Sequence, residues 1–159
     1  MTMREQTCCF TGHRMLPKRA IPALAQRLEE EILRLLAQGV RFFGAGGALG
    51  FDTLAAEAVL RLRPAHPALR LILVLPCKNQ AARWREEDRL RYEAILKQAD
   101  KVVYTSEEYD PGCMHRRNRY LAENSGHCLC YLTKTSGGTW YTVNCCRANG
   151  VSIRNLADP

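Results

Sequence analysis

Short apolar runs alternate along the chain with longer segments in which apolar residues recur every three or four positions. The short runs are rich in apolar and β-branched residues and are bounded by polar residues and glycine, which is typical of strands. The third run, LRLILVL, is almost continuously apolar, as expected of a strand that is covered on both faces. This pattern predicts strands at residues 7–11, 40–44, 69–75, 101–105, 127–132 and 151–153.

The segments between these runs predict amphipathic helices. In the first segment, apolar residues from Ile21 to Leu35 recur at spacings of three and four, which places them on one face of a helix. Pro17 suits the first turn of this helix, and Gly39 follows its end. Helices are predicted at about residues 17–37, 50–63, 84–98, 113–124 and 139–149.

Strict alternation of strand and helix predicts an α/β fold. We expect one Rossmann-like, doubly wound domain over residues 1–159, with a mainly parallel sheet and helices on both faces. A chain of 159 residues has the size of one domain with a substantial core. Such sheets bind ligands beyond the carboxyl ends of their strands, near the reversal in strand order. Candidate chemistry is therefore expected directly after each strand.

Composition and charge narrow the class of protein. The longest apolar runs are far shorter than the ~20 residues of a membrane-spanning helix, and the first residues show no secretory signal pattern. We therefore expect a cytoplasmic protein without membrane contact. The net charge of +7 is spread over both halves of the chain. It suits an anionic ligand or weak nucleic-acid contact, and equally a solvated basic surface.

The eight cysteines are expected to be reduced, because a cytoplasmic chain rarely keeps disulfides. Two pairs are adjacent in sequence, and Cys128-x-Cys130 is one residue short of the C-x-x-C spacing of zinc sites. On a strand, His127 points away from the face that Cys128 and Cys130 share. The sequence therefore predicts buried thiols and no metal site.

A cationic loop and a glycine-rich loop follow the first two strands. Gly12 allows a tight turn, His13 is a weaker ligand candidate, and Arg14 places a permanent cation there. After the second strand, glycines open directly into a helix, so that backbone amides can approach an anion; the alternative is a tight packing turn. Asp52 is either a helix cap or a ligand to ribose hydroxyls. The glycines of this loop are Gly44, Gly46, Gly47 and Gly50.

Polar residues also follow the third and fourth strands. Gln80 and Trp84 suit hydrogen bonding to and stacking on a nucleobase, although Trp84 can equally cover the sheet edge. In the fourth helix, Asn118 shares an apolar face with Met114 and Leu121 and therefore needs a polar partner or a ligand. Arg116 and Arg117 beside it can hold phosphates bidentately, unless this helix is simply a solvated basic surface.

A second glycine-rich loop follows the fifth strand, again before a helix. Its backbone amides and hydroxyl groups predict a second anion cradle. Two such loops on one sheet edge, with arginines between them, indicate an anionic ligand more specifically than either loop alone. The candidate residues are Ser136, Gly137, Gly138, Thr139 and Thr142.

Several of these motifs, taken in order, resemble the SLOG superfamily of Rossmann-like proteins and most closely its YpsA/YoqJ-like family. They are TGHR, GGALGFDTLAAE, LPCKNQAARW, HRRNRYLAENS and SGGTWYT. The segment RRNRYLAENS is also similar to the R-N-R motif of the DNA-processing protein DprA. The resemblance implies a Rossmann-like sheet that binds a nucleotide or a nucleotide-derived ligand, with no other cofactor expected.

The LOG branch of the superfamily consists of phosphoribohydrolases whose motif, P-G-G-x-G-T-x-x-E, ends in a catalytic glutamate. Here SGGTWYTVN places Thr142 and Asn144 around that position, and neither is a carboxylate. Glu57 and Asp52 are the acidic residues of the glycine-rich motifs that can substitute for it.

Three functions follow from these observations. The first is a binding or sensing domain for a small nucleotide-like ligand, as a monomer or homodimer. The second is a LOG-like enzyme that processes nucleotides. The third is a DprA-like single-stranded DNA binder, for which the even spread of charge is less suited than a basic stripe with interleaved aromatics.

Overall fold

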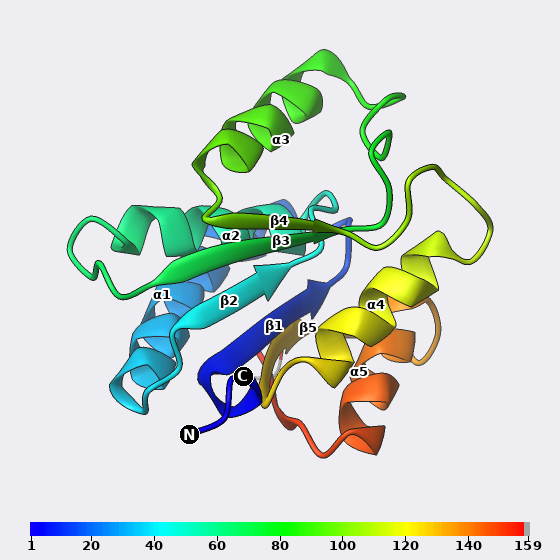
Figure 1. Cartoon of the computed structure of the whole chain (residues 1–159). Helices are drawn as coiled ribbons and strands as arrows, with labels where there is room; N and C mark the ends of the chain where they lie inside the picture. Colours follow the sequence, from blue (N-terminus) through cyan, green and yellow to red (C-terminus); the bar gives the residue numbers. More distant parts are fainter. Residues whose placement is uncertain (158–159) are drawn as a thin grey trace.

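The computed structural model describes residues 1–157 and contains a six-stranded sheet in which each strand is parallel to its neighbours (Figure 1). The strand order is β4-β3-β2-β1-β5-β6. The strands are β1 (Thr7–Gly12), β2 (Phe42–Ala45), β3 (Arg70–Leu75), β4 (Lys101–Tyr104), β5 (His127–Tyr131) and β6 (Ser152–Asn155). The last two residues of the predicted domain, 158–159, lie outside the described part.

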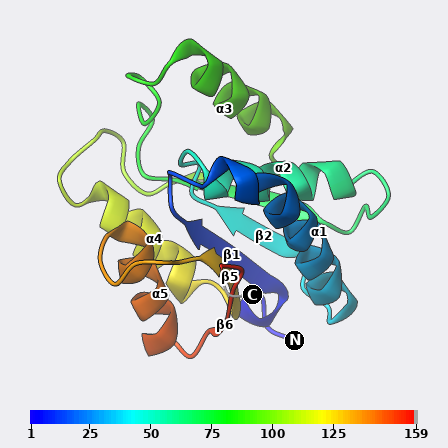
Figure 2. The ribbon, with the colours of Figure 1, turned by 180° about the vertical axis from the view of Figure 1, so that it is seen from behind.

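Five α-helices connect the strands and cover both faces of the sheet. Helices α1 and α2 lie on one face and α4 and α5 on the other, while α3 lies toward the β4 edge (Figures 1 and 2). The helices are α1 (Ile21–Ala37), α2 (Phe51–Leu62), α3 (Glu86–Gln98), α4 (Cys113–Glu123) and α5 (Gly138–Ala148). None of these helices combines the length and the apolar character needed to cross a membrane.

The fold class predicted from the sequence is confirmed, because each expected strand and helix is present and the sheet is parallel. The differences lie at the ends of elements. Trp84 was expected to begin a helix, but it lies in a turn and α3 begins at Glu86. The first helix was expected from about Pro17, but α1 begins at Ile21, and the residues before it form a short 3₁₀ helix, η2 (Lys18–Ala20). A second 3₁₀ helix, η1 (Arg4–Gln6), is additional.

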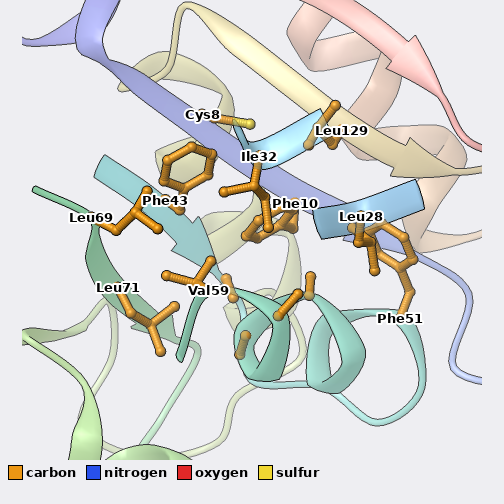
Figure 3. Packing of buried hydrophobic residues seen from close by; sticks show 14 of the residues in the cluster. Cys8, Phe10, Leu28, Ile32, Phe43, Phe51, Val59, Leu69, Leu71 and Leu129 are labelled. Atoms are coloured by element: carbon orange, nitrogen blue, oxygen red, sulfur yellow. The ribbon is translucent and has the colours of Figure 1, made fainter. Parts of the chain in front are cut away.

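Aromatic and aliphatic side chains from β1, β2, α1 and α2 form the larger core. Phe10 and Phe43 stack with ring centroids 5.9 Å apart, and Leu28 and Ile32 of α1 pack in the same fully buried cluster (Figure 3). Burial of each such side chain stabilises the fold by about 1.5–3 kcal/mol. The position of Phe51, at the start of α2, also explains Gly12, because a Cβ on that residue would collide with the Phe51 ring.

The strand order places a crevice at the carboxyl ends of β1 and β5. The chain runs outward from β1 through β2 and β3 to β4, and then returns to place β5 on the other side of β1. The loops that follow β1 and β5 therefore leave the sheet in opposite directions. This arrangement is the reversal point at which parallel sheets bind ligands.

Candidate functional site

A cavity of about 320 Å³ opens at the carboxyl ends of β1 and β5. This volume lies at the lower end of the range found for small-molecule sites. Backbone and side chains from three loops and α4 surround it. Its polar and glycine lining consists of Thr11, Gly12, His13, Arg14, Asp52, Arg117, Asn118, Lys134, Ser136, Gly137, Gly138 and Thr139.

The loop after β1 carries one cation and one structural histidine. Arg14 is exposed at the mouth of the cavity. His13 Nε2 accepts a hydrogen bond of 2.9 Å from the backbone N–H of Thr133, which ties this loop to the one after β5. Partial burial and the positive charge of Lys134 lower the pKa of His13, so the ring is neutral and can accept this bond at neutral pH. His13 therefore shapes the mouth of the cavity.

The glycine-rich loop between β2 and α2 is filled by two side chains of the protein itself, those of Asp52 and Arg117. Asp52 Oδ2 accepts the N–H of Ala48 at 3.2 Å, and the guanidinium of Arg117 donates to the carbonyl of Gly46. A Cβ on Gly46 would lie 2.5 Å from Arg117 Nη1 and 3.0 Å from Asp52 Oδ2. A carboxylate of the chain thus takes the place where the sequence analysis expected an external anion.

The glycines of that loop serve close packing in the structure. Gly47 and Gly50 have positive φ angles of 72° and 78°, and a Cβ on Gly50 would collide with the backbone of Arg14. Gly44 lies in β2 beneath Leu121. None of Gly44, Gly46, Gly47 and Gly50 lines the cavity, so the packing-turn alternative describes them better than the cradle.

Asp52 and Arg117 are buried groups of opposite charge at the cavity wall, and each influences the pKa of the other. Asp52 is 6% exposed and Arg117 is 5% exposed. Burial raises the pKa of Asp52 to about 6, although Arg117 and the N–H of Ala48 both act to lower it. Burial also lowers the pKa of Arg117, against the effect of Asp52. Arg117 Nε donates to Asn118 Oδ1 at 2.7 Å, which fixes both side chains at the cavity.

The second glycine-rich loop is open to the cavity. Gly137 precedes α5 with a φ of 92°, and a Cβ on Gly137 would meet no atom within 4 Å. Among residues 1–157, no side chain caps the N-terminus of α5, so its first N–H groups are available to an anion. Thr142 is buried and donates its hydroxyl to the carbonyl of Gly138 at 2.8 Å, so it holds the first turn of the helix.

Two charged candidates lie outside the cavity. Glu57 pairs with Arg91 of α3, with N···O distances of 2.8 and 2.5 Å. Arg116 is exposed and pairs with Asp110 at 3.2 Å. Successive residues of a helix point in different directions, so on α4 Arg116 faces solvent and Arg117 faces the cavity. Of these two arginines, only Arg117 lines the cavity. Of the two acidic candidates, only Asp52 lines the cavity.

A second cavity of about 460 Å³ adjoins the first, and Arg14 and Met114 line both. Gln80 and Trp84 line it as well. Trp84 packs edge-on against Tyr92, with ring centroids 5.2 Å apart. Within residues 1–157, Gln80 Oε1 is the only buried side-chain nitrogen or oxygen without a hydrogen-bond partner.

The sequence analysis missed several lining residues. Lys134 adds a cation to the first cavity, while Asn79, Arg83 and Tyr109 add polar and aromatic groups to the second. Lys134 follows β5 within three residues, the same signal that identified Arg14 after β1. Asn79, Arg83 and Tyr109 were not singled out beside Gln80 and Trp84, because the turns after β3 and β4 bring these residues together only in the folded chain.

The fold and the site define a Rossmann-like domain with a polar, cationic cavity at the reversal of strand order. A sequence model of a protein family, YpsA, which is described as the YspA SLOG family, matches residues 11–149 of this chain. The chain therefore belongs to this family, and the resemblance inferred from its motifs is confirmed. A relative from Halalkalibacterium halodurans, the UPF0398 protein BH1768, is 32% identical over 123 residues, covering 76% of this chain and 65% of its own length.

Solved structures of DNA processing protein A share this fold. The protein from Streptococcus pneumoniae matches 96% of this chain and 52% of its own, with a TM-score of 0.65 and 15% identity. The Helicobacter pylori protein, whose structure is described in terms of a single-stranded DNA binding mode, matches 96% of this chain and 67% of its own. Its TM-score is 0.64 and its identity 16%. At this identity the likeness concerns the fold alone.

Proposed function

We propose that this protein binds a nucleotide or a nucleotide-derived anion in the cavity between the loops after β1 and β5. The observation that carries the proposal is the uncapped N-terminus of α5, which opens into a cavity lined by Arg14, Arg117 and Lys134. Free backbone N–H groups, a helix dipole and fixed cations are the groups that bind phosphate in other proteins.

The adjoining cavity is suited to the base of such a ligand. Trp84 offers an aromatic surface, and Gln80 offers an amide whose oxygen lacks a partner. Arg14 lies between the two cavities, where a ligand that spans both would pass. A single ligand with its phosphate at α5 and its base near Trp84 would therefore occupy both cavities and pass Arg14.

Gly138 allows a sharp test of the phosphate site. A Cβ on Gly138 would have only Asn118 Nδ2 near it, at 4.0 Å, so substitution is sterically tolerated. In Gly138→Asp, a carboxylate at the first position of α5 favours the helix but competes with the anion. We expect unchanged or higher thermal stability and a loss of affinity of about 10- to 100-fold, the worth of a hydrogen bond to a charged group.

Gly138→Ala is the matched control, because it adds the Cβ without the charge. Both variants and the wild type are titrated calorimetrically with a panel of nucleoside mono- and diphosphates and nucleotide sugars. Equal affinities in Gly138→Asp and the wild type would place the anion elsewhere and refute the site.

Single-stranded DNA binding is the second candidate, and the fold shared with DNA processing protein A favours it. The measurement that separates the two is the salt dependence of binding to oligothymidylate. Each phosphate neutralised on a single strand adds about −0.7 to the slope of log K against log salt. A steep slope supports the DNA candidate, whereas oligonucleotide affinity no higher than that of a mononucleotide contradicts it.

The hydrolase alternative now rests on Asp52, since Glu57 is paired with Arg91 outside the cavity. With a pKa of about 6, Asp52 can exchange a proton near neutral pH. Chromatography of nucleoside monophosphates after incubation with the protein tests this alternative directly, because cleavage releases a free base. A cytoplasmic location and a homodimer stay predictions from the sequence.

A further inference from the structure

Three buried thiols from three elements converge between the sheet and α5. Cys9 lies on β1, Cys128 on β5, and Cys146 near the C-terminal end of α5. Their Sγ atoms all lie within 4.8 Å of one another, and those of Cys9 and Cys146 are 4.0 Å apart. Cys9 and Cys128 are register partners on adjacent strands, so their side chains leave the sheet on the same face.

We infer that Cys9, Cys128 and Cys146 form a binding site for a thiophilic d¹⁰ metal cation, Zn²⁺ or Cu⁺. Thiolate sulfurs lie about 2.3 Å from such an ion, so three of them bound to one ion are about 3.8–4.0 Å from each other. The observed separations reach this geometry with side-chain movements of less than about 1 Å. Soft thiolate ligands select these metals over harder cations.

A fourth sulfur distinguishes the two metals. Cys130 lies two residues beyond Cys128 on β5 and is buried in the same cluster. Zn²⁺ prefers four ligands and would recruit Cys130, whereas three thiolates suffice for Cu⁺. The guanidinium of Arg4 donates to the carbonyl of Asn149, just beyond the C-terminal end of α5. This cation offsets part of the negative charge that the thiolates would carry.

The site was not expected from the sequence, because Cys9 is more than a hundred residues from Cys128 and Cys146. Pairing of β1 with β5 brings Cys9 to Cys128, and packing of α5 on the sheet brings Cys146 to both. It lies near the C-terminal end of α5, whereas the ligand cavity lies at the N-terminal end of that helix. A metal here would fasten α5 to β1 and β5 and would not take part in ligand chemistry. Binding releases protons, because each thiol coordinates as its thiolate.

The test uses the full chain, reduced and stripped of metal under denaturing conditions. It is refolded with Zn²⁺, with Cu⁺ held by a competing chelator, or with neither, since the buried thiols are accessible during folding. We expect one metal ion per chain after gel filtration, proton release on binding, and a melting temperature raised by several degrees relative to the metal-free protein.

Single alanine variants identify the ligands. Cys9→Ala, Cys128→Ala and Cys146→Ala should each lower the affinity by more than about 100-fold. Cys8→Ala is the matched control: Cys8 is equally buried and adjacent to Cys9, but it belongs to the core on the other face of the sheet. Cys130→Ala should weaken Zn²⁺ binding and leave Cu⁺ binding unchanged.

Two outcomes would overturn the inference. The first is a wild-type chain that retains neither metal after refolding, a result that does not depend on any variant folding. The second is metal retention in the Cys128→Ala protein equal to that of the wild type, which would assign the ion to surface groups such as the half-exposed Cys145.

Discussion

Asp52 is the residue whose chemistry depends most on its surroundings. The sequence identified it as a helix cap or a ribose ligand, and the structure places its carboxylate on the N–H of Ala48 in a buried position. Burial raises the pKa of this carboxyl from 3.8 to about 6. The folded protein therefore binds the Asp52 proton more tightly than the unfolded chain does, and the stability contributed by this group decreases as the pH rises through that interval.

Asp52→Asn should remove this pH dependence. Between about pH 3 and pH 7 the stability of the variant should rise relative to the wild type by about 3 kcal/mol, the free-energy equivalent of the shift. Any cost of the substitution that does not depend on pH adds an offset but no slope. Urea unfolding of both proteins across this pH range measures the difference. A difference that is flat with pH would mean that Asp52 is ionised in the fold as readily as in the unfolded chain.

Among single residues, the position after a strand indicated several residues that line the cavity, and whether they bind a ligand stays a prediction. Arg14, Arg117 and Asn118 line the cavity, because the carboxyl ends of parallel strands meet at one edge of the sheet. Glu57 failed as a candidate because its partner, Arg91, lies 34 residues further along the chain and becomes its neighbour only through packing of α3 on α2.

At the scale of elements, the two glycine-rich loops look alike in sequence and differ in structure. The loop before α2 is closed by Asp52 and Arg117, whereas the loop before α5 is open. The difference arises from Asp52, which supplies an internal anion to the first loop, and from Gly137 and Gly138, which have no close neighbours. Sequence alone gave no reason to rank the second loop above the first.

Gly46→Ala tests this distinction. The added Cβ would crowd the Arg117 guanidinium and the Asp52 carboxylate, so we expect a loss of stability of about 1–3 kcal/mol, as for other overpacked positions. Gly112→Ala is the control, because its Cβ would meet nothing closer than 3.6 Å. Thermal melts and nucleotide titrations compare the two. If Gly46→Ala melts like the wild type and loses only affinity, the first loop is the anion cradle after all.

The strands and helices themselves were predictable because their apolar periods are long and regular. The ends of the elements were less predictable. The turn at residues 78–85 carries Trp84 and polar residues that suit either the start of a helix or a loop, and tertiary contacts determine which of the two forms. The bounds of β2 and β6 moved by one or two residues for the same reason.

At the scale of the whole molecule, strand order creates both the cavity and the thiol cluster. Each depends on β5 lying beside β1, a pairing between segments more than a hundred residues apart. Alternation of elements predicts a parallel sheet but not which strands are neighbours. This is why the sequence indicated which groups follow each strand but could not tell which loops would face each other.

The arginines of α4 lie on two sides of this helix. Arg117 is directed into the cavity, whereas Arg116 and Arg119 are exposed on the outer side. Arg119 donates to the hydroxyl of Tyr141 at 3.0 Å, and the Tyr141 ring stacks on His115 with centroids 4.0 Å apart. This outer side combines cations with stacked rings, which is the combination that proteins use to bind single-stranded nucleic acids.

The double variant Arg116→Ala/Arg119→Ala therefore separates the two candidate functions. If the cavity binds a free nucleotide, this variant keeps wild-type nucleotide affinity, because neither arginine lines it. If the protein binds single-stranded DNA along α4, the same variant loses oligothymidylate affinity and the salt slope falls by about 0.7 for each lost phosphate contact. Arg14→Ala/Lys134→Ala is the reciprocal control, since both residues line the cavity. We expect nucleotide binding to fail in this second variant and to persist in the first; the reverse pattern would move the function from the cavity to the outer side of α4.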